Sequence, residues 1–309
     1  MNRNKTILLG NSVNLLTNNN KKSYEKLILN LCSKYSCDKH SLIYKDLNKP
    51  LPLLYEELLH TAIKCNHNKD VIKNIKADLI EELNQIGIND YHKQYMELGI
   101  KNIFTSNYDY NLEKSISGKP INENILRENK FSLFRRKKIN NSYIWHIHGE
   151  INNENSLVLG YDNYVSYLSE MKKYLSSASV THKERIRSPY NFKNFDRNFD
   201  KTDNKIKYSW TDLFFRDDVH IVGLKLDYSE IDLWWLIATK GYKKLINPQT
   251  KNRYGETIVH YFKENNNSNS DMAKISMLKS FGVDIREYNI KREDDYKFNH
   301  DKILKEIKI

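Results

Sequence analysis

Small and polar residues gather at four points of the chain, each directly after a short apolar run of the kind that forms a buried strand. In chain order these groups are Gly10-Asn11-Ser12, Thr105-Ser106-Asn107-Tyr108-Asp109, His148-Gly149, and Gly223 through Asp227. In open α/β sheets, ligands bind outside the carboxyl ends of the strands, near the point where the strand order reverses. The four groups therefore predict a ligand site with glycine turns, amides, carboxylates and an imidazole.

The first group has the composition of a phosphate-binding turn. Gly10 would let the backbone approach a phosphate closely, and Asn11 and Ser12 offer donors where the next helix begins. An ordinary structural turn explains the same residues, so both interpretations stay open. The fingerprint G-x-G-x-x-G is absent from the sequence, which argues against the common dehydrogenase version of a nucleotide-binding fold.

Seven apolar runs predict strands, and helical patterns separate most of them. The predicted strands span 6–9, 100–105, 143–147, 157–159, 219–222, 257–262 and 283–288. One-face helical spacing over much of 22–98 predicts a helical insert after the first strand. This alternation favours an α/β fold, a Rossmann-like, doubly wound and mainly parallel sheet in a single domain of residues 1–309.

Two later segments carry specific expectations. Residues 186–207 are rich in Asn, Asp, Lys and Arg without an apolar period, which predicts a mobile loop or lid. A helix should follow Asp227, with Ser229 and Asp232 as its capping box. Most residues of this helix are apolar and leave little polar face, which predicts that the helix is buried.

The composition is that of a polar chain with an excess of basic residues. The formal net charge is +11 and the mean hydropathy is −0.73. No apolar run approaches the roughly 20 residues that a membrane helix needs, and the amino terminus lacks a signal-peptide pattern, so we expect a cytoplasmic protein that does not bind membranes. Lys and Asn are abundant throughout, so direct nucleic-acid binding is the weaker reading of the charge.

Cysteines and histidines give no metal-site pattern. Cys32, Cys37 and Cys65 form no Cys-x-x-Cys element, and we expect buried or incidental thiols rather than a disulfide or a zinc site. His146 and His148 lie two residues apart on one side of a predicted strand, but no third ligand has suitable spacing. No metal is predicted, and His146 is expected to be a structural histidine.

Several motifs together resemble one family. Thr105-Ser106-Asn107-Tyr108-Asp109 looks like the Thr-Thr-Asn-Tyr-Asp motif of the SIR2-like family of bacterial phage-defence proteins, and Ile-Trp-His-Ile-His-Gly at 144–149 resembles that family's His-Gly motif. Gly10-Asn11-Ser12 stands at the family's first glycine turn, with Ser12 in place of the usual glycine. Residues 157–161 and 222–232 resemble its later glycine segments, so the resemblance runs from residue 6 to about residue 240.

The resemblance implies that NAD is the substrate and that Asn107 and His148 are catalytic. Asn107 would hold a water molecule or a ribose hydroxyl, and His148, with a reference pKa of about 6.5, would accept a proton as the nicotinamide–ribose bond breaks. Asp109 is explained equally well as a helix cap, and Asp227, Glu230 and Asp232 as ribose ligands or as capping and solvated groups. The NAD-binding residues expected on this basis are Gly10, Asn11, Ser12, Thr105, Asp109, Gly149, Gly223 and Asp227.

Within this family the sequence favours NAD hydrolysis to ADP-ribose and nicotinamide over protein deacylation. Deacylases of the sirtuin type carry a four-cysteine zinc module, and this chain has no Cys-x-x-Cys pair. The resemblance further implies an abortive-infection effector, restrained until triggered through homo-oligomerisation or a partner such as a HerA-like ATPase. The alternatives are a module that senses NAD or a nucleotide without turnover, an NAD-dependent protein deacylase, and a basic nucleic-acid-associated subunit.

Overall fold

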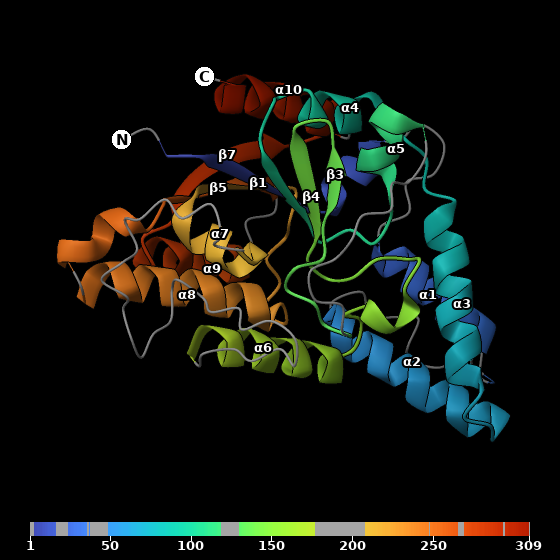
Figure 1. Cartoon of the computed structure of the whole chain (residues 1–309). Helices are drawn as coiled ribbons and strands as arrows, with labels where there is room; N and C mark the ends of the chain where they lie inside the picture. Colours follow the sequence, from blue (N-terminus) through green and yellow to red (C-terminus); the bar gives the residue numbers. More distant parts are fainter. Residues whose placement is uncertain are drawn as a thin grey trace.

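One twisted sheet organises the protein (Figure 1). The computed structural model describes residues 3–16, 24–35, 37, 49–118, 130–176, 208–246, 248–264, 269–292 and 294–308. Within them, seven strands lie in the order β3-β4-β2-β1-β5-β6-β7. Their bounds are Lys5–Leu9 (β1), Asn102–Thr105 (β2), Lys137–Ile139 (β3), Ser142–His146 (β4), Asp218–Val222 (β5), Thr257–Glu264 (β6) and Asp284–Ile290 (β7).

The strand order is that of a Rossmann fold. β3 pairs antiparallel with β4 at one edge, and the other pairings are parallel. Without β3, the strands numbered along the chain lie in the order 3-2-1-4-5-6, which reverses between β1 and β5. The predicted doubly wound, mainly parallel α/β fold is confirmed.

Helices cover both faces of the sheet, because successive strand residues point to opposite sides. Leu8 packs with α6–α9, and its neighbours Ile7 and Leu9 pack with α4 and α10. Figure 1 shows α4, α5 and α10 on one side and α7, α8 and α9 on the other. The helices span Tyr24–Tyr35 (α1), Leu51–Asn66 (α2), Val71–Asn84 (α3), Asp90–Met96 (α4), Asn111–Ser117 (α5), Tyr161–Ser176 (α6), Trp210–Arg216 (α7), Ile231–Ile246 (α8), Asn269–Ser280 (α9) and Asp294–Lys308 (α10).

Helices α1, α2 and α3 form a separate apolar cluster. Their buried side chains, such as Leu27, Leu58 and Leu79, pack with Tyr108 and Leu159, which follow the sheet strands β2 and β4. These helices lie within the insert predicted at 22–98, whereas α4 packs against the sheet. The loop predicted at 186–207 lies outside the described residues.

Two strand expectations are wrong. Residues 157–159 are buried but form no strand, since three apolar residues are too few to distinguish a strand from a packed loop. Strand β3 was not expected, because the sequence Lys-Lys-Ile does not look apolar. Lys137 is nevertheless buried, because its ammonium lies 2.9 Å from Oε2 of Glu150.

The start of α8 also differs from expectation. Asp227 Oδ1 accepts hydrogen bonds from the backbone and hydroxyl of Ser229, and Glu230 Oε2 accepts one from the Asp227 N–H at 3.0 Å. The capping box predicted for Ser229 and Asp232 is therefore wrong, and Asp232 binds a histidine instead. Nor is α8 buried throughout, because Tyr242, Leu245 and Ile246 on its last turns are exposed.

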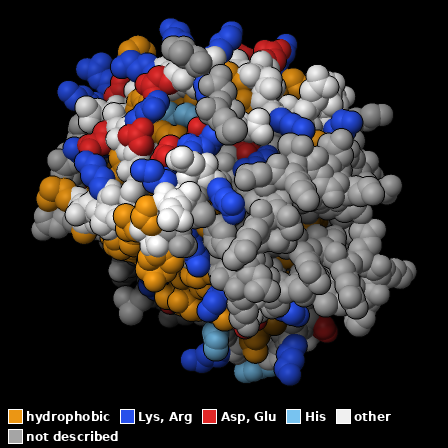
Figure 2. Space-filling view, turned by 60° about the vertical axis from the view of Figure 1, so that its left-hand side comes forward, with side chains coloured by type: hydrophobic (Ala, Val, Ile, Leu, Met, Phe, Trp, Pro, Cys, Tyr) orange, Lys and Arg blue, Asp and Glu red, His pale blue; other side chains and the backbone are white. Residues whose placement is uncertain are grey.

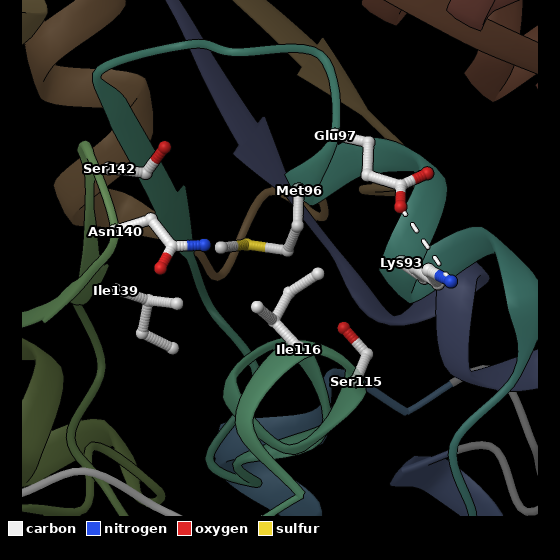
Figure 3. Close-up of a pocket in the computed structure, with 8 residues that line it drawn as sticks. All are labelled: Lys93, Met96, Glu97, Ser115, Ile116, Ile139, Asn140 and Ser142. Atoms are coloured by element: carbon white, nitrogen blue, oxygen red, sulfur yellow. Dashed lines mark ion pairs between the residues drawn. The ribbon is translucent and has the colours of Figure 1, made fainter.

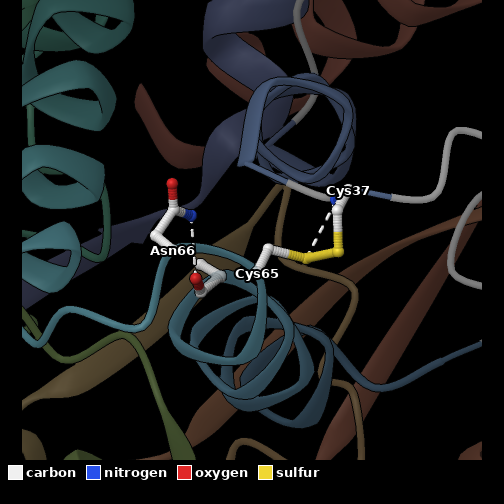
Figure 4. The surroundings of a disulfide bond; sticks show 4 residues. Cys37, Cys65 and Asn66 are labelled. Atoms are coloured by element: carbon white, nitrogen blue, oxygen red, sulfur yellow. Dashed lines mark hydrogen bonds between the residues drawn. A yellow bond between two sulfur atoms is a disulfide. The ribbon is translucent and has the colours of Figure 1, made fainter.

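A disulfide joins Cys37 and Cys65, 28 residues apart in sequence (Figure 4). The expectation of three free thiols is therefore wrong for this pair and confirmed for the buried Cys32. Cys37 lies two residues after α1 and Cys65 lies in the last turn of α2, so the packing of these helices brings the thiols together. The spacing of the pair matches no local motif that would have revealed the bond.

Basic and acidic side chains mix on one part of the face drawn in Figure 2. Figure 2 shows Lys and Arg interspersed with Asp and Glu on one face, next to a group of apolar side chains. None of the described helices combines the length and the apolar composition needed to cross a bilayer.

Candidate functional site

The parallel pairing of β2 with β4 brings two of the motifs side by side. Thr105 pairs with His146, and the Ile147 N–H donates to the Thr105 carbonyl at 3.0 Å. The pairing continues beyond the strand ends, where Nδ1 of His146 lies 3.2 Å from the carbonyl oxygen of Asn107. Asn107 and His148 thus lie in adjacent segments at the carboxyl ends of neighbouring strands.

Asn107 is half-buried, and hydrogen bonds of its backbone N–H and its side-chain amide fix its position. Its N–H donates to Thr105 Oγ1 at 3.0 Å, and its Nδ2 donates to the Gly10 carbonyl at 3.2 Å. Within the described residues its Oδ1 has no hydrogen-bond partner. That oxygen can accept a hydrogen bond from a water molecule or a hydroxyl.

His148 is almost fully buried, at 2% exposure, and is paired with a carboxylate. Its Nε2 lies 2.8 Å from Asp232 Oδ2, and the rings of Tyr164 and Tyr167 meet it edge-on. Burial opposes a charge on the ring, but the Asp232 carboxylate, with Glu230 adding to its effect, outweighs burial and raises the pKa of His148 above 6.5. With Nε2–H donated to Asp232, Nδ1 is the nitrogen that can exchange a proton.

Two acidic residues at the start of α8 complete the environment of His148. Asp232 is fully buried, and its Oδ1 has no partner among the described residues. Burial raises the pKa of Glu230 to about 7, with His148 opposing the shift and Asp232 adding to it. The sequence offers both as ribose ligands or as capping and solvated groups, and it does not predict that Asp232 binds His148. The available signal was the position of Asp232 in the buried stripe of α8, among Leu233, Leu236 and Ile237.

The glycines at the strand ends allow backbones to pack closely. A Cβ on Gly10 would lie 2.5 Å from the Gly223 carbonyl oxygen, and one on Gly223 would overlap Ser12 Oγ. Gly149 has φ +98°, and a Cβ there would overlap the Ser156 carbonyl. The space beside Gly10 is thus filled by the end of β5, at the point where the strand order reverses.

The residues after β1 are held by side chains from distant elements. The Ser12 N–H donates to the Gly223 carbonyl at 3.1 Å, and its Oγ lies 3.0 Å from His300 Nε2 in α10. Asp109 accepts hydrogen bonds from Asn14 Nδ2 at 2.8 Å and from the Asn111 N–H at 3.0 Å. Asp109 therefore lies one residue before Tyr110, the N-cap residue of α5, where it accepts from the first helical N–H and also anchors the turn after β1.

A cavity of about 380 Å³ lies elsewhere (Figure 3). Its lining includes Lys93 and Glu97 of the α4 region, Ile116 of α5, and Asn140 and Ser142 of the β3–β4 turn. Because β4 begins at Ser142, this cavity is at the amino end of the strand, away from His148. Among the described residues, no three His, Cys, Asp or Glu side chains are arranged to bind a metal.

The comparisons with known proteins point to one domain family. Residues 101–189 match the family model described as a SIR2-like domain. The matched segment contains Asn107, His146 and His148, but Gly10, Asp227 and Asp232 lie outside it. No curated protein sequence matches the chain. The match supports a relationship to SIR2-like proteins and NAD-related chemistry.

Proposed function

We propose that this protein, with its SIR2-like segment, hydrolyses NAD to ADP-ribose and nicotinamide. One observation carries the proposal: the Asn107 amide and the His148 imidazole lie in adjacent segments at the carboxyl ends of β2 and β4, and a buried carboxylate holds the imidazole. This is the edge at which Rossmann folds bind their ligands.

The free atoms at this edge suit the ribose part of NAD. Asn107 Oδ1 is an acceptor without a partner in the described part of the chain, and ribose hydroxyls and water are donors. Asp232 is fully buried and acts through His148. The N–H groups of Gly10 and Ser12 already bond to the end of β5. The fit therefore depends on Asn107, His148 and Asp232, and we assign Gly10, Asn11, Ser12, Thr105, Asp109, Gly149, Gly223 and Asp227 the role of shaping or lining the same site.

Asn107, His148 and Asp232 have separate roles in the proposed hydrolysis. Asn107 Oδ1 orients a water molecule or a ribose hydroxyl, and His148 Nδ1 accepts the proton that is released as water adds to the ribose carbon and nicotinamide leaves. Asp232 stabilises the imidazolium that forms, and the proton then passes to solvent. Bound NAD supplies the nicotinamide–ribose bond, and the net change consumes one water and releases one proton.

Hydrolysis is favoured over deacylation because the chain has no Cys-x-x-Cys pair for a sirtuin-type zinc module. We further propose, on the sequence resemblance, that the protein is a cytoplasmic abortive-infection effector that depletes NAD after phage infection. Homo-oligomerisation or a HerA-like ATPase would release its activity.

The test measures nicotinamide and ADP-ribose after purified protein is incubated with NAD, and measures NAD content in phage-infected cells that express it. The Asn107→Ala and His148→Ala variants should lose at least roughly 100-fold in rate. Lys93→Ala, at the cavity of Figure 3, is the control and should retain full activity. Activity that persists in both site variants refutes the assigned roles. Calorimetric binding of NAD without product in either setting would favour a sensing module instead.

A further inference from the structure

His146 lies between two hydrogen-bond acceptors. Its Nε2 is 2.6 Å from Glu113 Oε1, and its Nδ1 is 3.2 Å from the carbonyl oxygen of Asn107. A carbonyl cannot donate, so Nδ1 must carry a proton to make the second contact. Either the ring carries both protons, or Glu113 shares its proton with Nε2. In both cases Nδ1–H donates to Asn107.

This pair is fully enclosed. Glu113 is 0% exposed and His146 is 1% exposed, and the Tyr110 ring packs edge-on against the imidazole. Burial opposes the charged ring, Glu113 and Glu150 favour it, and Lys137 disfavours it, with a net rise in the pKa of His146. The second Glu113 oxygen, Oε2, has no partner in the described part of the chain.

A buried ion pair of this kind contributes little net stability, because desolvation of both charges offsets their attraction. Its location is informative. Glu113 comes from the first turn of α5, His146 ends β4, and their shared contact is the backbone of Asn107. With this contact to its carbonyl, Asn107 is held at three points, since its N–H and its side-chain Nδ2 also make hydrogen bonds.

We infer that Glu113 and His146 are positioning residues, which fix the peptide of Asn107 so that its side-chain Oδ1 faces the reacting water or hydroxyl. The inference rests on the proposed NAD hydrolysis. The buried pair does not touch the substrate itself, but it has a specific task in the reaction. Partners of this type, one step removed from the reacting groups, typically change activity roughly 10- to 100-fold.

The first test needs no enzymatic activity. In wild-type protein with ¹⁵N-labelled histidine, NMR should show His146 with a proton on Nδ1 at neutral pH. In Glu113→Gln, which keeps the side-chain shape without the charge, the ring should carry one proton fewer or bind it over a lower pH range. A wild-type ring without a proton on Nδ1 overturns the inference.

The second test compares rates of NAD hydrolysis. Glu113→Ala should lower kcat roughly 10- to 100-fold with little change in KM, and Glu113→Gln should restore part of the loss. His220→Asn removes the hydrogen bond of another buried histidine of the same sheet, away from the site, and should keep wild-type kcat. A folded Glu113→Ala protein with wild-type kcat overturns the inference when Asn107→Ala is inactive. If wild-type protein hydrolyses no NAD, the proposed function fails, and the NMR result alone decides the geometry.

Discussion

The two histidines of the Ile-Trp-His-Ile-His-Gly segment differ in how many of their nitrogens are engaged. Both nitrogens of His146 face protein acceptors, whereas His148 gives only Nε2 to Asp232. A proton carrier needs one nitrogen that exchanges with the reacting group. The hydrogen bonds therefore suit His146 to a structural task, as the sequence analysis expects, and leave His148 suited to chemistry.

Asp232→Asn tests the pairing with His148. A base must be unprotonated, so the wild-type rate should fall as pH drops through the His148 pKa, which the neighbouring Asp232 raises above 6.5 against the effect of burial. Without the carboxylate, burial dominates and that pKa decreases. We expect the acidic limb of the pH–rate profile to move to lower pH and kcat to fall roughly 10- to 100-fold.

The measurement is kcat and kcat/KM from pH 5 to 9. Asp271→Asn, which alters a carboxylate bonded to Tyr261 in another part of the fold, is the matched control. An acidic limb that stays in place in Asp232→Asn would show that His148 does not set the profile.

At the scale of elements, the ends of β1 and β5 are locked together by two glycines. Gly10→Ala should lower the free energy of unfolding by ~1–3 kcal/mol, because its Cβ would lie 2.5 Å from the Gly223 carbonyl oxygen and 2.8 Å from its carbon. Gly87→Ala is the matched control, since nothing lies within 4 Å of its Cβ position. Urea unfolding of both variants measures the difference, and equal stabilities would disprove the close approach.

The disulfide links the ends of α1 and α2. Closing a loop of this length stabilises a fold by ~3.5 kcal/mol in the chain-entropy account, so Cys37→Ser should lower Tm by at least a few degrees. Dithiothreitol should lower the wild-type Tm equally and leave Cys37→Ser unchanged. Differential scanning calorimetry with and without reductant checks this, and a reductant-insensitive wild-type Tm would contradict it.

The sequence predicts elements well where the signal is local. Six of the seven predicted strands are present, because buried parallel strands are short apolar runs that end in a turn. The errors depend on distant partners: Lys137 in β3 needs Glu150, Asp232 binds His148, and Cys37 meets Cys65. At the site, the adjacency of the two catalytic candidates follows from parallel pairing of strands that the sequence does predict. The sequence does not predict the buried neighbours that set the pKa values of His148 and Glu230.

At the scale of the whole molecule, neutral imidazoles join α4 and α10 to the sheet. His300 of α10 contacts Tyr95 at 2.7 Å and Ser12 at 3.0 Å, and His220 and His260 bond to each other at 3.0 Å. Tyr288 donates its proton to Glu306, so His260 Nδ1–H donates to the Tyr288 oxygen, which fits a neutral ring. The fold is thus built with several buried histidines in their uncharged form.

This arrangement predicts a protein that loses stability in mild acid. Burial, with Arg286 adding to it, lowers the pKa of His220 to about 4, and burial lowers those of His260 and His300 to about 3. In the unfolded chain these rings titrate near 6.5, so the unfolded state binds more protons below that pH, and stability falls as pH decreases. Each ring contributes at most ~2 kcal/mol of loss by pH 5.

Urea unfolding at pH 7.5, 6 and 5 should show this decline, and His260→Gln should flatten it. The exposed His60→Gln is the control and should keep the wild-type dependence. Because His146 and His148, whose pKa values are raised, contribute with the opposite sign, the comparison with the variant decides: an identical pH dependence in wild-type protein and His260→Gln would mean that His260 is charged in the folded protein.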